Sequence, residues 1–535
     1  MRHITLACAI AGGLGATIAT ANADPIKTSG GLVSGVTLPG SVEAYKGIPY
    51  AKPPVGDLRW RAPEPASPWP GTLAATAFGA ICFQPPPLGG HSFFTELFFN
   101  PMTPMSEDCL TLNVWTTARA GDRRPVMVWI PGGGFRGGSA AGAIYDGAVL
   151  ARKGVVLVSF NYRLWKLGFL ALHELSQESP HHVSGNYGLL DQIAALRWVK
   201  SNIAAFGGNA DNVTIFGQSA GSTSANFLMS SPLAKGLFQH VIGESGGGFA
   251  PTKPGSMLGR FTPTLADAEA TGAKLMTALK AKTLADMRAK TAEQILAVPS
   301  SDRFESGLPV TDGYVLTAPM QDVFGRGQQN DVPLLAGSNS DEGSNFPSFR
   351  TLAAFREDAR KTLGPFADEF FTLYPAADDA QARRASEHAV RDTRIGWPNF
   401  EWAKTQARTG HAKTFYYYFS HHPSAQPNEN YVENLGKDLG AYHGAELAYV
   451  FGNFVPRRWP WADADRKLSE TVQQYWVNFA TNGDPNGPGL PPWPVFDSAK
   501  DSVLHIDGAI SAGPPPYRQN YAFWDKVAAG WKGPE

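Results

Sequence analysis

The sequence predicts an α/β fold, in which a mostly parallel central sheet has helices on both of its faces. Five short apolar runs bounded by turn residues indicate buried strands, at residues 126–130, 155–160, 213–216, 241–243 and 333–336. Between the second and third runs, apolar residues recur at helical spacing over residues 188–206, and two glycines end that helix. Strands rich in Val, Ile and Leu that alternate with helices are typical of a parallel sheet covered on both faces.

The composition indicates one large globular unit and excludes several classes of protein. Of 535 residues, 43% are apolar and 17% are charged, which supplies a sizeable core and excludes general disorder. Lysine and arginine total 46 against 47 acidic residues, so no basic surplus indicates nucleic acid as a partner. Because no clear linker divides the chain, we expect a single domain over residues 24–535, with cap-like helical insertions at roughly 253–330 and 345–440.

The first 23 residues have the pattern of a signal peptide. Arg2 and His3 precede an apolar stretch rich in small residues, and Ala21-Asn22-Ala23 follows with small residues where a signal peptidase cuts. Cleavage is predicted after Ala23, so that the protein would be secreted or periplasmic. Later residues contain no run of 18 uninterrupted apolar residues, so no integral membrane association is expected.

Cysteine usage agrees with export. The signal peptide holds Cys8, so the mature chain has two cysteines, Cys82 and Cys109. In an oxidising compartment such a pair is best interpreted as one disulfide, with two free buried thiols as the alternative. The disulfide would stabilise the fold by about 3–4 kcal/mol in the chain-entropy model.

A nucleophile signal lies at residues 213–221, where an apolar strand runs into the pattern G-x-S-x-G. Ser219 stands between Gly217 and Gly221, and a helix-compatible segment follows over residues 220–229. A serine on a tight strand-to-helix turn is presented above the edge of the sheet, and the flanking glycines let the backbones pass without clashing. The helix N-terminus also favours developing negative charge. This context predicts that Ser219 is a nucleophile.

Two other glycine patterns need separate interpretations. Ser245 also lies in a G-x-S-x-G pattern, but the three glycines after it are poor helix formers, so we expect a buried hydrogen-bonding serine. Residues 132–137 formally match the dinucleotide pattern G-x-G-x-x-G. That pattern requires a helix and an acidic residue about 20 positions further on, and the sequence favours neither. The loop is better interpreted as a source of N–H groups for an oxyanion, and no cofactor is expected.

Candidates for an acid and a base follow the serine in the chain. The strand at 333–336 leads to Asp341 and Glu342, and both qualify by position as the acid. Six histidines come later, namely His388, His411, His421, His422, His443 and His505. His421 and His422 follow a strand-like segment at 414–419, whereas His443 lies in a glycine-flanked loop suited to placing an imidazole over a serine. No His-Glu-x-x-His or similar ligand cluster appears, so no metal is expected.

Blocks of sequence along nearly the whole mature chain resemble the type-B carboxylesterase/lipase family, the cholinesterase-like branch of the α/β-hydrolases. They are YKGIPYA at 45–51, PPVG at 53–56, LRWRAPEP at 58–65, SEDCLTLNV at 106–114, GNYGLLDQ at 185–192, FGGN at 206–209, GQSAG at 217–221, DEG at 341–343 and HG at 443–444. The resemblance implies the α/β-hydrolase fold and hydrolysis of carboxylic esters. It also implies a catalytic triad of Ser219, Glu342 and His443, and so selects Glu342 over Asp341.

The resemblance assigns the oxyanion hole to the N–H groups of Gly133, Gly134 and Ala220. Family members commonly have histidine before these glycines, whereas this chain has Pro131, which lacks an N–H and fixes φ. We therefore expect a loop that is anchored differently but keeps its backbone donors. The family pattern further implies a Cys82–Cys109 disulfide, an ion pair between Arg59 and Glu107, and a gorge rim carrying Phe93, Phe94, Phe98 and Phe99.

The sequence thus predicts a secreted serine carboxylic-ester hydrolase that forms an acyl-enzyme on Ser219. The expected partner is a small-molecule ester, either a small or medium apolar or aromatic ester or a polycarboxylate ester. Phe135 and Arg136 directly follow the glycines and are candidate substrate-binding residues, because Arg136 would meet a carboxylate on the acyl group. Some bacterial relatives remove such groups from fumonisin-type toxins. The alternative is a catalytically silent cholinesterase-like binding protein, which the presence of all three triad residues disfavours.

Overall fold

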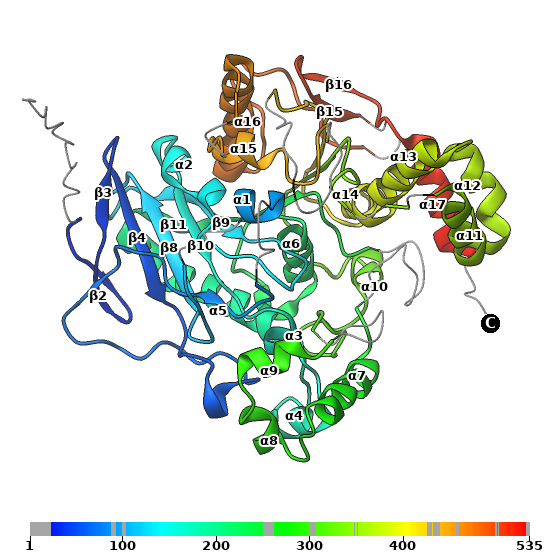
Figure 1. Cartoon of the computed structure of the whole chain (residues 1–535). Helices are drawn as coiled ribbons and strands as arrows, with labels where there is room; N and C mark the ends of the chain where they lie inside the picture. Colours follow the sequence, from blue (N-terminus) through cyan, green and yellow to red (C-terminus); the bar gives the residue numbers. More distant parts are fainter. Residues whose placement is uncertain are drawn as a thin grey trace, which may run out of the picture.

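A computed structural model describes residues 23–86, 92–98, 103–249, 262–299, 307–346, 348–349, 351–424, 431, 439–455, 459–497, 500 and 502–530. Among these residues, an eleven-stranded sheet crosses the molecule in the order β16-β15-β14-β13-β12-β11-β9-β10-β8-β4-β3 (Figure 1). Its strands are β3 (Val36–Leu38), β4 (Val42–Pro49), β8 (Thr111–Thr116), β9 (Arg124–Ile130), β10 (Val156–Phe160), β11 (Gly208–Gln218), β12 (His240–Glu244), β13 (Leu334–Asn339), β14 (Thr414–Phe419), β15 (Val503–Ile506) and β16 (Ser511–Gly513).

The centre of this sheet is parallel and its margins are antiparallel. Strands β10, β9, β11, β12, β13, β14 and β15 run parallel to one another. The antiparallel strands are β8, β4 and β3 at one margin and β16 at the other. Each of the five strands expected from sequence is present, with ends moved by a few residues. The predicted fold class, a mostly parallel sheet with helices, is confirmed.

Alternation along the strands explains why helices cover both faces. On β9, Val126, Val128 and Ile130 pack in one core with helices α5 (Tyr187–Asn202), α6 (Ala220–Ser230) and α14 (Trp397–Thr409). Met127 and Trp129 point to the other face and pack with α2 (Ala148–Arg152), α15 (Leu447–Phe451) and α16 (Asp463–Asn482). Because side chains of a strand alternate between faces, an all-apolar strand has to bury both of them.

The other helices lie outside these layers. They are α1 (Phe93–Phe98), α3 (Trp165–Phe169), α4 (His173–Glu178), α7 (Leu265–Ala278), α8 (Leu284–Arg288), α9 (Ala292–Ala297), α10 (Met320–Gly325), α11 (Leu352–Leu363), α12 (Ala367–Leu373), α13 (Asp379–Val390) and α17 (Arg518–Gly530). Helices α7–α9 gather beside α3 and α4, and α11–α13 gather beside α17 (Figure 1). Within residues 345–440, α14 and β14 belong to the sheet and its cover, so the helical insertion there is made by α11–α13 and the π-helix Arg391–Gly396.

Five short strands complete the N-terminal part. Strands β1 (Ile26–Thr28), β2 (Gly31–Ser34) and β5 (Thr72–Ala74) form a small sheet, and β6 (Ile81–Cys82) pairs with β7 (Met105–Ser106). The signal peptide expected at residues 1–23 lies, apart from Ala23, outside the described residues. None of the helices in the described part of the chain is long and apolar enough to cross a membrane.

Candidate active site

Ser219 lies on a sharp turn between β11 and α6. Strand β11 ends at Gln218 and α6 begins at Ala220, which leaves Ser219 alone at the turn with φ 58° and ψ −124°. A positive φ is costly for a residue with a side chain, and it persists where surrounding contacts hold it. Here the Ser219 N–H donates to the Glu244 carbonyl oxygen at 2.9 Å, and the Thr223 N–H donates to the Ser219 carbonyl oxygen at 2.9 Å. The turn therefore presents the Ser219 side chain beyond the carboxyl end of the strand.

The two glycines of the motif are required by close packing around this turn. A Cβ at Gly217 would lie 2.5 Å from the carbonyl carbon of Gly221, and a Cβ at Gly221 would lie 2.0 Å from the Ile130 carbonyl oxygen. Neither position has room for a side chain, because backbone atoms occupy the space. The glycines of G-x-S-x-G are thus required because the ends of β9 and β11 and the start of α6 are in backbone contact.

Of the two candidate acids, Glu342 contacts the histidine. Glu342 is fully buried in the loop after β13, and its Oε2 lies 2.5 Å from Nδ1 of His443. Its Oε1 accepts a hydrogen bond from the Asn339 N–H at 2.7 Å, so both carboxylate oxygens are held. A buried carboxylate bound at Nδ1 fixes the orientation of the imidazole and leaves Nε2 for proton transfer.

The neighbouring Asp341 has a different set of contacts. Its Oδ2 accepts from the Ala441 N–H at 3.0 Å and from the Ser340 hydroxyl at 2.5 Å, and lies 3.7 Å from His422 Nε2. Asp341 therefore joins the acid-bearing loop to the loop that carries His443. Although they are adjacent in sequence, the two carboxylates point to different partners.

His443 lies in a loop after β14 and is held on several sides. The Asn345 side chain donates to its carbonyl oxygen at 3.2 Å, and the Phe346 ring packs on the imidazole with centroids 5.1 Å apart. The amide nitrogen of Gln218, the residue before Ser219, lies 3.2 Å from His443 Nε2. The same amide nitrogen lies 3.4 Å from His443 Nδ1, so these contacts place the imidazole ring at the strand end that carries Ser219.

The other candidate histidines lie elsewhere. His421 Nε2 is bound to the Asp465 carboxylate at 2.8 Å, and the His422 side chain is 57% exposed beside Asp341. His505 Nε2 is hydrogen-bonded to the Pro514 carbonyl oxygen at 2.9 Å. Among the described residues, His443 is the histidine that pairs with Glu342.

The glycine loop after β9 has its donors on the accessible side. Gly133, Gly134 and Phe135 have φ values of 115°, 66° and 62°, and the N–H groups of Arg136 and Gly137 close the loop onto the Gly133 carbonyl oxygen. Among the described residues, no hydrogen bond engages the N–H of Gly133 or Gly134. Successive N–H groups of this kind form an anion-binding concavity.

Ala220 adds a further N–H at the same end of the sheet. It is the first residue of α6, where a helix leaves its N–H groups without intrahelical acceptors. Gly132 is the point of contact between the glycine loop and the Ser219 turn. A Cβ at Gly132 would lie 2.5 Å from the Gln218 carbonyl oxygen and 3.2 Å from the Ser219 Cβ. The glycine loop therefore packs directly against the serine turn.

The loop is anchored without a histidine before its glycines. The Tyr162 hydroxyl donates to the Pro131 carbonyl oxygen at 2.9 Å, and the Trp165 N–H donates to the Phe135 carbonyl oxygen at 2.7 Å. Both donors belong to the segment after β10. Main-chain carbonyl groups of the loop therefore accept these two anchoring hydrogen bonds. Neither bond uses an N–H at position 131, so the proline there does not remove them.

Phe135 and Arg136, the candidate substrate residues, differ in exposure. The Phe135 side chain is 2% exposed and packs edge-on against Phe169, with ring centroids 5.5 Å apart. The Phe135 side chain therefore packs inside the protein against the glycine loop and presents little surface to a substrate. The Arg136 guanidinium is half-buried and lies 4.4 Å from the centre of the Trp165 ring.

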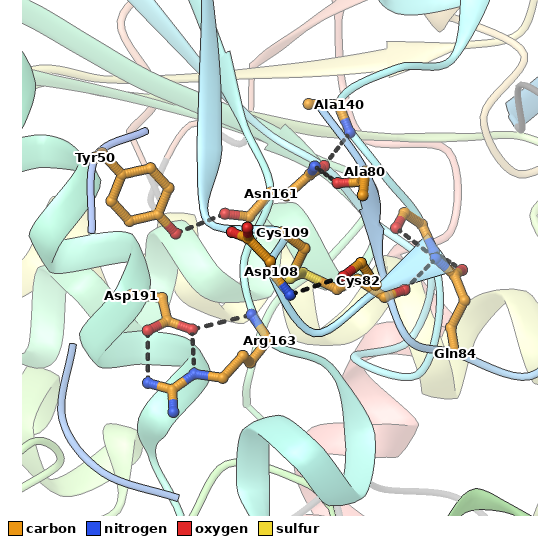
Figure 2. The surroundings of a disulfide bond; sticks show 12 residues. Tyr50, Ala80, Cys82, Gln84, Asp108, Cys109, Ala140, Asn161, Arg163 and Asp191 are labelled. Atoms are coloured by element: carbon orange, nitrogen blue, oxygen red, sulfur yellow. Dashed lines mark hydrogen bonds and ion pairs between the residues drawn. A yellow bond between two sulfur atoms is a disulfide. The ribbon is translucent and has the colours of Figure 1, made fainter. Parts of the chain in front are cut away.

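Cys82 and Cys109 form the expected disulfide beside this loop (Figure 2). The Arg59–Glu107 ion pair implied by resemblance is also present, with both guanidinium–carboxylate contacts at 2.5–2.7 Å. Of the aromatic rim residues, the Phe98 ring lies against Gly444, since a Cβ there would be 3.1 Å from Phe98 Cζ. Phe99 lies outside the described residues.

Two buried glutamates near Ser219, Glu342 and His443 were not identified from sequence. Glu446 accepts from the Asn339 amide at 2.5 Å and from the Ser245 hydroxyl at 3.5 Å, and the Trp476 N–H donates to Glu244 at 2.7 Å. Burial, together with the Glu342 carboxylate, raises the pKa of Glu446 to about 7. Burial and the Glu446 carboxylate raise the pKa of Glu244 well above its ordinary value. Ser245 is fully buried, as the sequence predicted for the second G-x-S-x-G motif.

Comparisons with known proteins agree with this arrangement. A model of the carboxylesterase family matches residues 22–524. Fumonisin B1 esterase of Sphingopyxis macrogoltabida is 37% identical over 91% of this chain and 87% of its own length. Para-nitrobenzyl esterase of Bacillus subtilis (strain 168) is 36% identical over 91% of this chain and 95% of its own length.

Similarity extends to solved structures and to vertebrate proteins. Cholinesterase of Mus musculus is 34% identical over 90% of this chain and 83% of its own length. A solved structure of a PNB esterase, an α/β-hydrolase, matches with a TM-score of 0.76 at 33% identity and covers 94% of this chain and 99% of that one. The chain therefore belongs to the carboxylesterase family and is a carboxylic-ester hydrolase with the α/β-hydrolase fold.

Proposed function

We propose that the enzyme hydrolyses esters through an acyl-enzyme on Ser219, with Glu342 and His443 as the other triad members. The observation that carries this proposal is the 2.5 Å contact between Glu342 Oε2 and His443 Nδ1 beside the Ser219 turn. A bound carboxylate holds the imidazole in the tautomer whose Nε2 accepts a proton. The strained turn keeps the serine hydroxyl clear of the sheet.

The proposed reaction has two stages. His443 Nε2 takes the hydroxyl proton as Ser219 Oγ attacks the ester carbonyl carbon, and the tetrahedral oxyanion accepts from the N–H groups of Gly133, Gly134 and Ala220. The ester C–O bond breaks, the alcohol leaves with the proton from His443, and water then attacks the acyl-enzyme by the same route. General acid–base catalysis contributes about 10²–10⁴-fold. Each oxyanion donor contributes about 10²–10³-fold.

The proposed substrate is a small or medium ester with an apolar or aromatic acyl group or with a polycarboxylate acyl group. Phe98 beside Gly444 and Phe346 beside His443 support apolar groups, because both rings lie next to the imidazole loop. Arg136, which follows the oxyanion loop directly, supports a carboxylate-bearing acyl group. The similarity to a fumonisin B1 esterase supports the second class.

We further propose that residues 1–23 are a signal peptide, so that the mature enzyme is secreted or periplasmic. Residues 24–535 would then form one catalytic domain, with the helical groups α7–α10 and α11–α13 as cap-like insertions. The support is the basic, apolar and small-residue pattern of the first 23 residues. N-terminal sequencing of the exported protein tests it, and a mature chain that begins anywhere other than Asp24 contradicts the predicted cleavage.

The test of the chemistry is turnover of a p-nitrophenyl ester by the Ser219→Ala variant. Turnover is expected to fall to background, and an organophosphate should label the wild type but not this variant. Ser245→Ala is the matched control, because Ser245 occupies the other G-x-S-x-G motif and should keep its activity. Retained turnover in Ser219→Ala overturns the assignment, and a wild type that binds esters without releasing a burst of alcohol supports the silent binding protein.

The test of substrate class is a panel of matched neutral and carboxylate-bearing acyl esters with the Arg136→Ala variant. Loss of a charge-assisted hydrogen bond should lower kcat/KM for the acidic esters by about 10–100-fold and leave the neutral esters within about twofold. Arg123→Ala, which removes an exposed arginine paired with Asp211, serves as the control. Equal losses on both ester classes contradict the carboxylate role of Arg136.

A further inference from the structure

We propose that Gln84 is a positioning residue of the oxyanion hole. Its side-chain amide holds Gly138 at the base of the glycine loop, and thereby sets the Gly133 and Gly134 N–H groups relative to Ser219. The inference rests on the proposed function, because it concerns the donors that the mechanism assigns to the oxyanion. Gln84 itself is not placed to touch the substrate, since it acts through the loop.

The contact between Gln84 and Gly138 uses both ends of the amide. Gln84 Oε1 accepts from the Gly138 N–H at 2.8 Å, and Gln84 Nε2 donates to the Gly138 carbonyl oxygen at 3.2 Å. The same Nε2 donates to the Cys82 carbonyl oxygen at 3.1 Å. The side chain is 2% exposed, so water does not compete for these groups. A paired contact of this kind fixes the backbone on both sides of the Gly138 Cα, because it engages the N–H of one peptide unit and the carbonyl oxygen of the next.

The glycine loop transmits the position of Gly138 to the oxyanion donors, because its two arms touch. A Cβ at Gly138 would lie 2.1 Å from the Gly132 carbonyl oxygen, and a Cβ at Gly133 would lie 2.1 Å from the Gly137 carbonyl oxygen. Gly132 in turn packs against the Ser219 turn, since a Cβ at Gly132 would lie 3.2 Å from the Ser219 Cβ. Gly138 therefore cannot shift without displacing Gly132 and Gly133.

The disulfide gives Gln84 a firm base. Cys82, two residues before Gln84, is linked to Cys109 and pairs in β6 with Ser106 of β7. Figure 2 shows Gln84 and Asn161 both close to this disulfide. Asn161 reinforces the junction, because its Oδ1 accepts from the Ala140 N–H at 2.9 Å and its Nδ2 donates to the Ala80 carbonyl oxygen at 3.0 Å. The cystine segment is thus joined to the loop's C-terminal arm at two points.

The expected consequence is a loss in kcat with little change in KM. Oxyanion donors act at about 2.7–3.1 Å from the position that the oxygen takes in the transition state, so a small displacement weakens them there first. The neutral carbonyl of the ground-state ester interacts more weakly with the same N–H donors, so their displacement has less effect on substrate binding. Because Gln84→Ala displaces the donors without removing them, we expect kcat to fall by about 10–100-fold, less than for complete loss of a donor.

The experiment compares Gln84→Ala with wild type on a p-nitrophenyl ester and on a trifluoromethyl ketone. Ser219 Oγ adds to the ketone carbon, its proton moves to His443, and the resulting hemiketal oxyanion occupies the oxyanion hole. For Gln84→Ala, the inhibition constant for the ketone should rise by the same factor by which kcat/KM falls, with KM within about twofold. An unchanged kcat and an unchanged ketone affinity overturn the proposal.

Asn186→Ala is a matched control for loss of a buried amide. Asn186 is 2% exposed and holds Val310 in the same way, with contacts of 2.7 and 2.9 Å to its carbonyl oxygen and N–H. The control should lose thermal stability like Gln84→Ala but keep kcat and ketone affinity. If both variants lose kcat equally, the effect of Gln84 is general destabilisation and the positioning role is wrong.

A second variant, Gln84→Glu, covers the case in which Gln84→Ala does not fold. It keeps the acceptor for the Gly138 N–H and loses the donors to the Gly138 and Cys82 carbonyl oxygens, so it should also lower kcat and ketone affinity together. Full activity in this folded variant contradicts the proposal. Failure of the proposed function has a different signature, because Ser219→Ala would then retain turnover whatever Gln84 does.

Discussion

Replacing Glu446 by glutamine should stabilise the enzyme more at high pH than at low pH. Burial and the Glu342 carboxylate raise the pKa of Glu446 to about 7, so the folded protein holds this proton more tightly than the unfolded chain does. The free energy of unfolding therefore falls as the pH rises from the unfolded pKa, about 4.3, toward 7. At about 1.36 kcal/mol per pKa unit, the raised pKa of Glu446 costs about 3.7 kcal/mol of stability well above pH 7, and about 1 kcal/mol at pH 5.

A glutamine side chain at this position can keep the hydrogen bonds that Glu446 makes. Its Oε1 can accept from the Asn339 amide, and its Nε2 can donate to the Ser245 hydroxyl oxygen. With no charge to bury, Glu446→Gln should gain about 2–3 kcal/mol relative to wild type between pH 5 and pH 8. The assay is urea unfolding followed by tryptophan fluorescence at pH 5, 6, 7 and 8.

An exposed carboxylate provides the control for this prediction. Glu64 is paired with Lys52 at the surface, and this pairing lowers the pKa of Glu64, which is the opposite direction. Glu64→Gln should therefore give no stabilisation that grows with pH. If the difference between Glu446→Gln and wild type is the same at all four pH values, Glu446 is not ionised at a cost in the folded protein and the reasoning fails.

Three further predictions follow from the site and its supports. Glu342→Gln should lower kcat by about 10³–10⁴-fold at nearly unchanged KM, because a neutral amide no longer stabilises the imidazolium, and Asp341→Asn should cost far less; equal losses would contradict the assignment of the acid. Gly221→Ala should lower stability by about 1–3 kcal/mol in urea unfolding, because its Cβ would meet the Ile130 carbonyl oxygen at 2.0 Å, and an unchanged midpoint would contradict the close packing. Replacing Cys82 and Cys109 by serine should cost about 3–4 kcal/mol in the same measurement, and dithiothreitol should then leave that variant unaffected.

The central elements could be predicted from sequence because each depends on contiguous residues. Short apolar runs buried on both faces identified β9–β13, and a helical period identified α5. The Ser219 turn could be predicted because close packing around it allows only glycine at positions 217 and 221, and these glycines are visible in the sequence as a motif. Strand ends were less accurate, since β11 and β13 extend where neighbouring strands offer hydrogen bonds.

The choice between Asp341 and Glu342 shows where contiguous sequence stops being informative. Both residues follow the same strand, and resemblance to a family was needed to prefer Glu342. In the structure Glu342 contacts His443, and Asp341 contacts Ala441 two residues before that histidine. The distinction is a matter of side-chain direction in one loop relative to another loop, 101 residues away in the chain.

Gln84, Asn339 and Glu446 were not recognised because each is a single polar residue outside any pattern, and Gln218 was not recognised because it occupies a variable position of G-x-S-x-G. Their partners are distant in the chain, as in the contacts of Gln84 with Gly138 and of Asn339 with Glu446, separated by 54 and 107 positions. One weak signal existed, since Glu446 follows His443 by three residues at the start of α15. Nothing local distinguishes such residues from ordinary surface polar residues until burial is known.

Local order in the chain was thus sufficient to predict the fold class, the strand-to-helix turn and the serine that lies on it, since periodicity and glycine sterics act between near neighbours. Which carboxylate meets which histidine, and what supports the glycine loop, were decided when the parallel sheet brought the carboxyl ends of β9, β11, β13 and β14 to one edge. That edge gathers loops from across the chain, and burial there makes each hydrogen bond between them specific.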